Sequence, residues 1–261
     1  MLKYLIYIFD FFKEVNKLHR FYTENIRPSD KNAVITGDDV KHMRKVLRLK
    51  EGDEITLCDF NKTDYLCKIT AINEKEVNLS VLSICENRLE PPVNITLFQG
   101  LPKSDKLEYI IQKCVEIGVM KIVPTITKRS VVKISDGEKK RARWQKIADE
   151  AAKQCGRGKR VEILPPVSFE NAVLSVESGV LKLMPYENEE KISLKNILKN
   201  SDKNDIAVFI GPEGGFDTSE VEFAAKNGVQ TVTLGPRILR TETAPVAVIS
   251  ACMYEKGGWE R

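Results

Sequence analysis

The sequence is poor in histidine and has no closely paired cysteines, and these two shortages narrow its chemistry. Only His19 and His42 are histidines among 261 residues, and the six cysteines include no C-x-x-C spacing. A zinc site and a Ser-His-Asp hydrolase are therefore disfavoured. No apolar run reaches the roughly 18 residues that a membrane span needs. We expect a soluble, cytoplasmic protein with reduced thiols, no bound metal and no membrane partner.

An excess of charge of one sign is also lacking for the chain as a whole. Its 41 Lys+Arg and 37 Asp+Glu leave a formal net charge of +4, and 42% of the residues are hydrophobic. Disorder, collagen and coiled coil are excluded as whole-chain descriptions. Residues 121–160, however, hold thirteen Lys+Arg and four Asp+Glu, a local net charge of +9. This concentration favours a polyanionic partner, and the alternative is a solvated helix face.

The usual nucleotide-binding fingerprints are missing as well. The nearest approach to G-x-x-x-x-G-K-[ST] is Gly156-Arg157-Gly158-Lys159-Arg160, and no G-x-G-x-x-G opens a helix after the first apolar strand. A P-loop NTPase and a Rossmann-type dinucleotide or methyl-donor site are both disfavoured.

Two periodicities divide the chain. Residues 21–86 alternate apolar and polar side chains between turns, which predicts a small β-barrel. Glu90-Pro91-Pro92 is the predicted linker, because two prolines cannot continue a sheet ladder. Helical patterns then alternate with short apolar runs, which predicts a mostly parallel α/β sheet with ligands at the carboxyl ends of its strands. Strands are predicted at 93–98, 122–126, 161–164, 180–184, 206–210 and 231–234.

Two segments of the N-terminal half need separate interpretation. Residues 1–17 are apolar and aromatic but have no cleavage site, so a helical extension or a mis-assigned start is favoured over a signal peptide. Residues 38–48 predict a short helix with Asp38 as N-cap and an apolar side that includes Val46. Its basic residues form either a solvated face or a contact with phosphates.

Two glycine-proline loops follow predicted strands near the C-terminus. The first is Gly211-Pro212-Glu213-Gly214-Gly215, before a helix with Asp217 as N-cap and Glu220 in the capping-box position. The second begins at Gly235-Pro236 and runs to Pro245. We expect two adjacent strand ends to deliver both loops to one edge of the sheet, where glycines let backbone groups approach a flat ligand.

With these loops, the motifs at 99–103, 113–119, 129–130 and 150–157 closely resemble the SPOUT-class 16S ribosomal RNA uridine N3-methyltransferases, from His19 to Arg261. The resemblance implies a PUA-like RNA-binding β-barrel over 18–88 and a SPOUT α/β trefoil-knot domain over 89–261, with the knot at about 206–256. Residues 1–17 are surplus to that pattern. It also implies a homodimer.

The resemblance further implies S-adenosylmethionine (S-adenosyl-L-methionine) as the cofactor, bound by the two loops. The residues expected to hold it are Ile210, Gly211, Pro212, Glu213, Gly214, Gly215, Leu234, Gly235, Ile238, Leu239 and Thr243.

Methylation of uridine at N3 requires removal or polarisation of an imide proton. In the loop that would face the donor methyl group, Arg240 is the candidate stabiliser of negative charge on O2 or O4. Glu242 is the candidate base, or the residue that orients Arg240. The alternative for this pair is a structural ion pair.

The partner that the resemblance implies is 16S ribosomal RNA in the 30S subunit, with the uridine numbered 1498 as target. Another RNA substrate, or a non-catalytic RNA-binding role in ribosome assembly, are the alternatives. Stacking on the target base is expected from Phe216, Phe21 or Tyr22, unless these are core aromatics. Contacts with RNA are expected from Arg20, Arg44, Arg48, Lys103, Arg129, Gln154 and Arg157.

Overall fold

The computed structural model describes residues 18–131 and 137–260 and divides into two compact units. The first unit contains the described residues up to Glu90 together with Gly156–Arg160, and the second contains the remainder from Pro91 onward. The division thus falls between Glu90 and Pro91, inside the predicted linker. The expectation for residues 1–17 lies outside the described residues.

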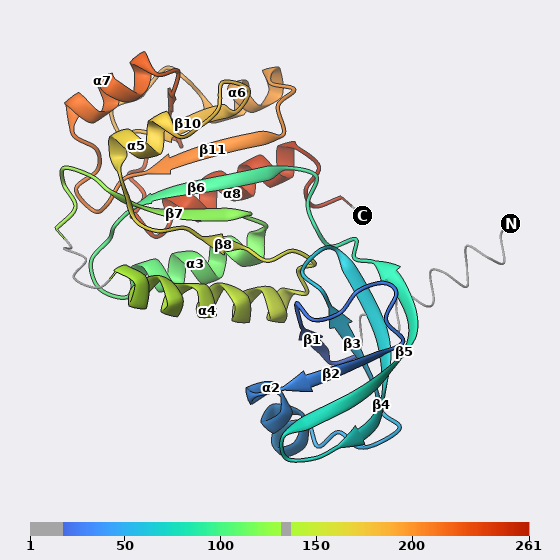
Figure 1. The fold of residues 1–261 in the computed structure, drawn as a ribbon. Coiled ribbons are helices and arrows are strands. Elements are labelled where there is room, and N and C mark those ends of the chain that lie inside the picture. The colour runs from blue at the N-terminus through green and yellow to red at the C-terminus, as the bar shows by residue number, and fades with distance from the viewer. Residues whose placement is uncertain (1–17, 132–136, 261) are drawn as a thin grey trace, which may run out of the picture. The chain divides into compact units, whose positions relative to one another are not determined.

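A five-stranded curled sheet forms the first unit, in the order β1-β3-β4-β5-β2 (Figure 1). Its pairs are antiparallel except that β1 runs parallel to β3. Tyr65, Cys67 and Ile69 are buried while the residues between them are half-buried or exposed, so the predicted alternation is confirmed. The strands are β1 (Arg20–Tyr22), β2 (Asn32–Thr36), β3 (Glu54–Cys58), β4 (Thr63–Ile72) and β5 (Glu76–Glu86).

The segment Gly156–Arg160 belongs to this unit, although it follows a helix of the other one. Lys159 forms a β-bridge with Asn61, and the Lys62 N–H donates a hydrogen bond of 2.9 Å to the Gly158 carbonyl. This return of the chain has no periodic sequence signal, because it is short and held by backbone bonds.

The prediction of one helix at residues 38–48 is only partly confirmed. It consists of α2 (Asp38–Lys41) and a π-helical turn, η1 (His42–Val46), and its N-cap is Gly37 with no side-chain bond. A π-turn is wider than an α-turn and rotates the residues that follow it. Val46 is accordingly 65% exposed instead of lying on the apolar side.

A seven-stranded sheet forms the second unit, in the order β12-β10-β11-β6-β7-β8, with β9 also beside β7. Every pairing among its described strands is parallel, as the sequence predicted. The strands are β6 (Asn94–Gly100), β7 (Lys121–Ile126), β8 (Glu162–Ile163), β9 (Val167–Ser168), β10 (Leu181–Pro185), β11 (Asp205–Ile210) and β12 (Gln230–Val232). The helices are α3 (Lys106–Ile117), α4 (Gly137–Cys155), α5 (Phe169–Leu174), α6 (Leu194–Asn200), α7 (Thr218–Lys226) and α8 (Ala244–Glu255).

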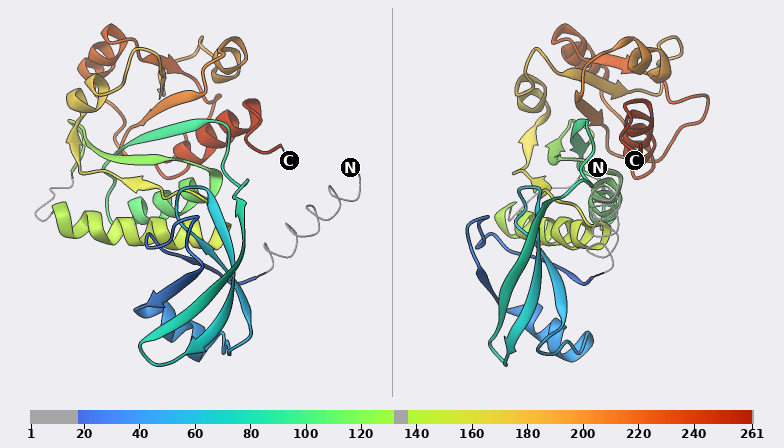
Figure 2. Two further views of the ribbon diagram at one scale, coloured as in Figure 1. Left: turned by 45° about the vertical axis from the view of Figure 1, so that its right-hand side comes forward. Right: turned by 90° about the vertical axis from the view of Figure 1, so that its right-hand side faces the viewer.

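Helices cover both faces of this sheet (Figure 2), and a separate hydrophobic core fills each face. One core packs α3, α4, α6 and α8 against it, and the other packs α5 and α7. The apolar residues of α3 are buried together, because side chains three and four positions apart share one side of a helix; they are Leu107, Ile110, Ile111, Cys114 and Val115. The second unit is therefore a three-layer α/β/α domain.

The chain crosses itself between β12 and α8. Strand β12 lies at one end of the sheet, yet α8 packs against α3 and β11 in its interior. The connecting segment must therefore pass the loop that follows β11. Buried Thr241 marks the crossing, since its hydroxyl donates a hydrogen bond of 2.7 Å to the Gly211 carbonyl. The segment between β12 and α8 is thus bonded to the loop after β11, within the range 206–256 where the sequence places the knot.

Candidate active site

The two glycine-proline loops lie at the carboxyl edge of the parallel sheet, as predicted. Their strands, however, are not adjacent, because β10 lies between β11 and β12. The segment that follows β10 therefore also reaches this edge, and Glu187 lies beside the first loop. A Cβ added to Gly215 would come within 2.7 Å of the Glu187 carboxylate.

The first loop turns immediately after β11. The Gly215 N–H donates to the Pro212 carbonyl over 3.0 Å, and Gly215 has a φ of +66° that favours glycine. Pro212 packs against Gly100 at the end of β6, where an added Cβ would lie 2.7 Å from the proline ring. Gly100 is thus required for the close approach of this loop to β6.

Substituting Gly100 by alanine is expected to destabilise the second unit by about 1–3 kcal/mol, because neither the Pro212 ring nor the β6 backbone is free to move aside. Thermal unfolding should show a lower midpoint. Gly179 is the matched control, since a Cβ added there meets nothing within 4 Å. An equally stable Gly100→Ala variant would mean that the loop does not pack as the structure shows.

The capping box predicted for α7 is confirmed. The Asp217 side chain accepts from the Ser219 N–H, and the Glu220 carboxylate accepts from the Asp217 N–H over 2.9 Å. Buried Glu220 also accepts a bond of 2.9 Å from the Lys128 N–H, which joins this helix to the segment after β7. Arg129 supports the same region by donating to the Gly214 carbonyl over 2.8 Å. The predicted RNA contact Arg129 is therefore also a brace of the first loop.

Gln99 connects the two crossing segments. This fully buried glutamine at the end of β6 donates 3.1 Å to the Thr241 hydroxyl, which in turn donates to Gly211. The sequence analysis gave neither Gln99 nor Thr241 a role of its own. A glutamine inside an apolar strand is the signal that could have identified the connection, because a buried amide must find partners.

A lysine joins the acidic residues of the two loops. The Lys106 ammonium lies 3.2 Å from a carboxylate oxygen of Glu213 and 3.1 Å from one of Glu242. Lys106 is the first residue of α3, where the helix dipole disfavours a cation. Lys106 was not predicted as a site residue, although a lysine in that unfavourable position is a signal that acidic partners lie nearby.

The pKa values in this cluster follow from the two ion pairs. Partial burial tends to raise the pKa of the Glu242 carboxyl, but its own backbone N–H, Lys106 and the charge of Arg240 outweigh this and lower it below 4.5. The pKa of Glu213 is lowered in the same way, by backbone N–H groups and Lys106 against burial. The bond to Glu242, followed by the bond to Glu213, raises the pKa of Lys106. All three groups are charged at neutral pH.

The remaining predicted cofactor residues differ in their exposure to solvent. Gly235 is exposed at a φ of +101°, and an added Cβ there meets nothing within 4 Å. Arg240 and Thr243 are exposed, Leu234 and Leu239 are half-buried, and Ile210 is buried under the first loop. Ile238 is 87% exposed, so the second loop presents an apolar side chain to its surroundings.

Two of the predicted RNA-binding arginines are instead structural. Arg20 makes two bonds of 2.6 and 2.9 Å to the Asp64 carboxylate, and Arg157 makes two bonds of 2.8 Å to Glu90. Their side chains are only 9% and 4% exposed. The prediction fails for both because each guanidinium is buried against a carboxylate.

The other residues predicted to contact RNA differ in how far they are buried. Arg48, Lys103 and Gln154 are exposed, and Arg44 is half-buried near Glu74 at 3.9 Å. The proposed stacking residues Phe21, Tyr22 and Phe216 are all buried as core aromatics, so the expectation that one of them stacks on a base is wrong.

The described residues contain neither a cluster suited to a metal ion nor a helix suited to a membrane. Within residues 18–131 and 137–260, no group of three or more His, Cys, Asp or Glu side chains is arranged to hold a metal ion. Within the same ranges, no helix has the length and apolar character needed to cross a bilayer.

Two family models match the chain. An RNA methyltransferase domain matches residues 89–253, and an RNA methyltransferase PUA domain matches residues 35–82. Among curated relatives, the ribosomal RNA small subunit methyltransferase E of Bacillus subtilis is 36% identical over 85% of this chain and 89% of its own length. The protein of the same name from Aquifex aeolicus is 32% identical over 90% of this chain and 99% of its own length.

Solved structures agree with the family models. A ribosomal RNA small subunit methyltransferase E from Neisseria gonorrhoeae, bound to S-adenosyl methionine, has a TM-score of 0.83 and 33% identity, covering 91% of this chain and 97% of its own. A putative methyltransferase of Legionella pneumophila with the same cofactor has a TM-score of 0.82 and 30% identity, with the same coverage of both chains. With a PUA-like barrel, a SPOUT-type α/β domain and this degree of identity, the chain belongs to the RNA methyltransferase family that includes the small-subunit methyltransferases E.

Proposed function

We propose that this protein transfers a methyl group from S-adenosylmethionine to N3 of the uridine numbered 1498 in 16S ribosomal RNA of the 30S subunit. It does so as a cytoplasmic homodimer. The observation that carries the proposal is the Glu213–Lys106–Glu242 cluster, which fixes both glycine-proline loops at the carboxyl edge of the sheet. The same cofactor is bound in the Neisseria gonorrhoeae relative.

The loops fit a flat, polar cofactor. A Cβ added to Gly211 would lie 3.0 Å from the Gly215 backbone, and one added to Gly215 would lie 2.7 Å from the Glu187 carboxylate, whereas Gly235 stands in open space. Backbone N–H and C=O groups at residues 210–215 and 234–239, with Thr243, would hold the adenosine part. S-adenosylmethionine, when bound, supplies an electrophilic methyl group on a sulfonium sulfur.

The chain must then prepare the nucleophile. N3 of uridine carries a proton that leaves only above neutral pH, so the site must stabilise the negative charge that remains on O2 and O4. Arg240, exposed in the second loop, is the cation assigned to that charge. Glu242 is ionised and able to accept the N3 proton, but its lowered pKa makes it a weak base. Most of the assistance therefore comes from Arg240 and from alignment of N3 with the methyl group.

Transfer of labelled methyl to 30S subunits that lack the modification tests this proposal. Label is expected in 3-methyluridine at one position. Donor binding without transfer to 30S subunits would shift the substrate to another RNA, and RNA binding without donor binding would leave a non-catalytic factor.

Replacing Lys106 by methionine is expected to reduce kcat/KM by up to about 10²-fold, because both loops lose their common anchor and the reacting groups are misplaced. The pKa of Glu242 should also rise, since burial is then less opposed by positive charge. The acidic limb of the pH–rate profile should therefore lie at higher pH in the variant than in the wild type.

Lys226→Met is the control, since Lys226 is exposed in the last turn of α7, at the end of that helix remote from the first loop. Lys106→Arg should recover part of the rate. An unchanged pH profile in Lys106→Met would show that Lys106 does not govern the ionisation of Glu242.

A further inference from the structure

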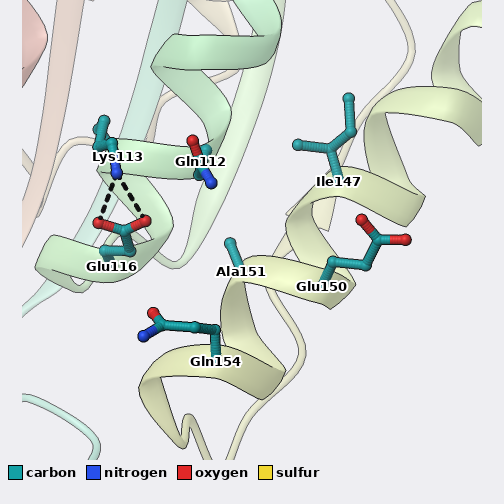
Figure 3. Close-up of a pocket in the computed structure, with 7 residues that line it drawn as sticks. All are labelled: Gln112, Lys113, Glu116, Ile147, Glu150, Ala151 and Gln154. Atoms are coloured by element: carbon teal, nitrogen blue, oxygen red, sulfur yellow. Dashed lines mark hydrogen bonds and ion pairs between the residues drawn. The ribbon is translucent and has the colours of Figure 1, made fainter. Parts of the chain in front are cut away.

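A groove separates α3 from α4 in the second unit and is not part of the loop site (Figure 3). Its volume is about 380 Å³, within the size range of small-molecule sites. Ile147 and Ala151 of α4 contribute its apolar surface. The polar residues that line it are Gln112, Lys113 and Glu116 from α3 and Glu150 and Gln154 from α4.

The polar side chains of the groove differ in whether they have bonding partners. Lys113 and Glu116 bond to each other over 2.9 Å. The side chains of three groove residues have no hydrogen bond or ion pair within the described part of the chain. These exposed residues are Gln112, Glu150 and Gln154. Two amides and one carboxylate therefore stand available around a small apolar surface.

This combination matches the requirements of a nucleobase. An amide side chain donates and accepts at once, so it pairs with two atoms of a base edge, and a carboxylate accepts from an exocyclic amino group. The apolar side chains of Ile147 and Ala151 suit the face of a base. Three side chains of this kind favour a base that bears an amino group over uracil.

The surrounding charge favours RNA over a protein partner. Helix α4 carries six basic and three acidic residues, and five of the basic ones precede the groove along the helix. Lys146 is exposed one turn before Glu150. Arg141 and Arg143 are paired with Glu138 and Glu108, but the helix keeps an excess of positive charge that attracts a phosphate backbone and positions a strand without reading its sequence.

We propose that the α3–α4 groove binds one unpaired, amino-bearing nucleotide of the RNA substrate, read by Gln112, Gln154 and Glu150. The inference rests on the proposed function in that it adds a second reading point to the same RNA. It makes the RNA contact that the sequence predicts for Gln154 a contact with a base, within the second unit.

The first test measures methyl transfer to 30S subunits by Gln112→Ala, Gln154→Ala and the double variant. Each single change should raise KM for the subunit by roughly tenfold, with kcat and donor affinity unchanged. Gln230→Ala, an exposed glutamine on β12, is the matched control. Variants that behave like this control would overturn the proposal.

The second test uses no methylation, so it separates this proposal from the function itself. Binding of the five-nucleotide probes oligo(A), oligo(C) and oligo(U) is followed by fluorescence anisotropy. The wild type should bind oligo(A) or oligo(C) more tightly than oligo(U), and Glu150→Gln should reduce that preference. Loss of preference alongside normal oligomer binding supports the groove even if no methyl transfer occurs.

A protein occupant gives a different result. If the double variant changes the oligomeric state in sedimentation while its oligonucleotide affinities stay at the control values, a second copy of the chain covers the groove and the proposal is wrong.

Discussion

Replacement of Arg240 by alanine should lower kcat for methyl transfer by about 10²–10³-fold while the affinity for S-adenosylmethionine stays close to that of the wild type. The loss is expected in kcat and kcat/KM together, because the guanidinium meets negative charge only as the N3 proton departs. Single-turnover transfer to 30S subunits and donor binding by calorimetry measure the two quantities separately.

The structure makes this substitution a clean one. The Arg240 side chain is exposed, whereas its carbonyl accepts bonds of 2.9 Å from the N–H groups of Thr243 and Ala244. Alanine keeps that backbone arrangement and removes only the charge. Arg240→Lys should retain part of the rate, since a single ammonium lacks the planar fork of a guanidinium.

A different result for Arg240→Ala would assign the stabilising cation to another residue. If Arg240→Ala transfers methyl at the wild-type rate, the cation near Glu242 that serves catalysis must be Lys106, and Arg240 is a surface residue of the loop. The loss of rate and the shift of the pH profile would then both be expected in the Lys106→Met variant.

The sequence predicted most of the second unit because its signals are local. Buried parallel strands give short apolar runs, the apolar side of α3 follows helical spacing, and a capping box marks the start of α7. The order of the strands in the sheet was not predictable in this way. Placing β10 between the two loop strands depends on long-range packing, and it brings Glu187 to the site.

The site was predicted through its loops but not through its connections. Gly211–Gly215 and Arg240–Glu242 are marked by unusual composition, whereas the only sequence signal at Lys106 is a cation at the start of a helix. The RNA-binding arginines show the opposite error. Arg20 and Arg157 belong to a basic pattern, but a carboxylate distant in sequence buries each of them.

The pair between Arg157 and Glu90 should be among the strongest single contributions to the stability of the first unit. Arg157→Ala leaves Glu90 as an uncompensated buried charge and is expected to cost about 3–5 kcal/mol. Hydrogen exchange of the β3, β4 and β5 amides measures the effect within this unit. Arg160→Ala is the matched control, because its partner Glu24 is 66% exposed and such surface pairs contribute about 0–1 kcal/mol.

Removing both charges separates the ion pair from the packing. The Glu90 carboxylate also accepts N–H bonds from Gly158 and Lys159, at 2.9 and 3.0 Å. Glu90→Gln combined with Arg157→Met keeps an acceptor for these bonds and should recover most of the lost stability. A double variant as unstable as Arg157→Ala would show that the arginine's length and donors, and not its charge, hold the segment.

Acid should weaken the same contact. Burial alone raises the pKa of Glu90, but its bonds to Arg157 and to two backbone N–H groups outweigh burial and lower it below 4.5. A carboxyl with a depressed folded-state pKa stabilises the fold above its unfolded value, and this stabilisation is lost as the pH falls through the folded value. Wild-type protection of the first unit should therefore decline below pH 4.5. The Glu90→Gln/Arg157→Met variant lacks this titration, so the difference between the two proteins should shrink as the solution is acidified.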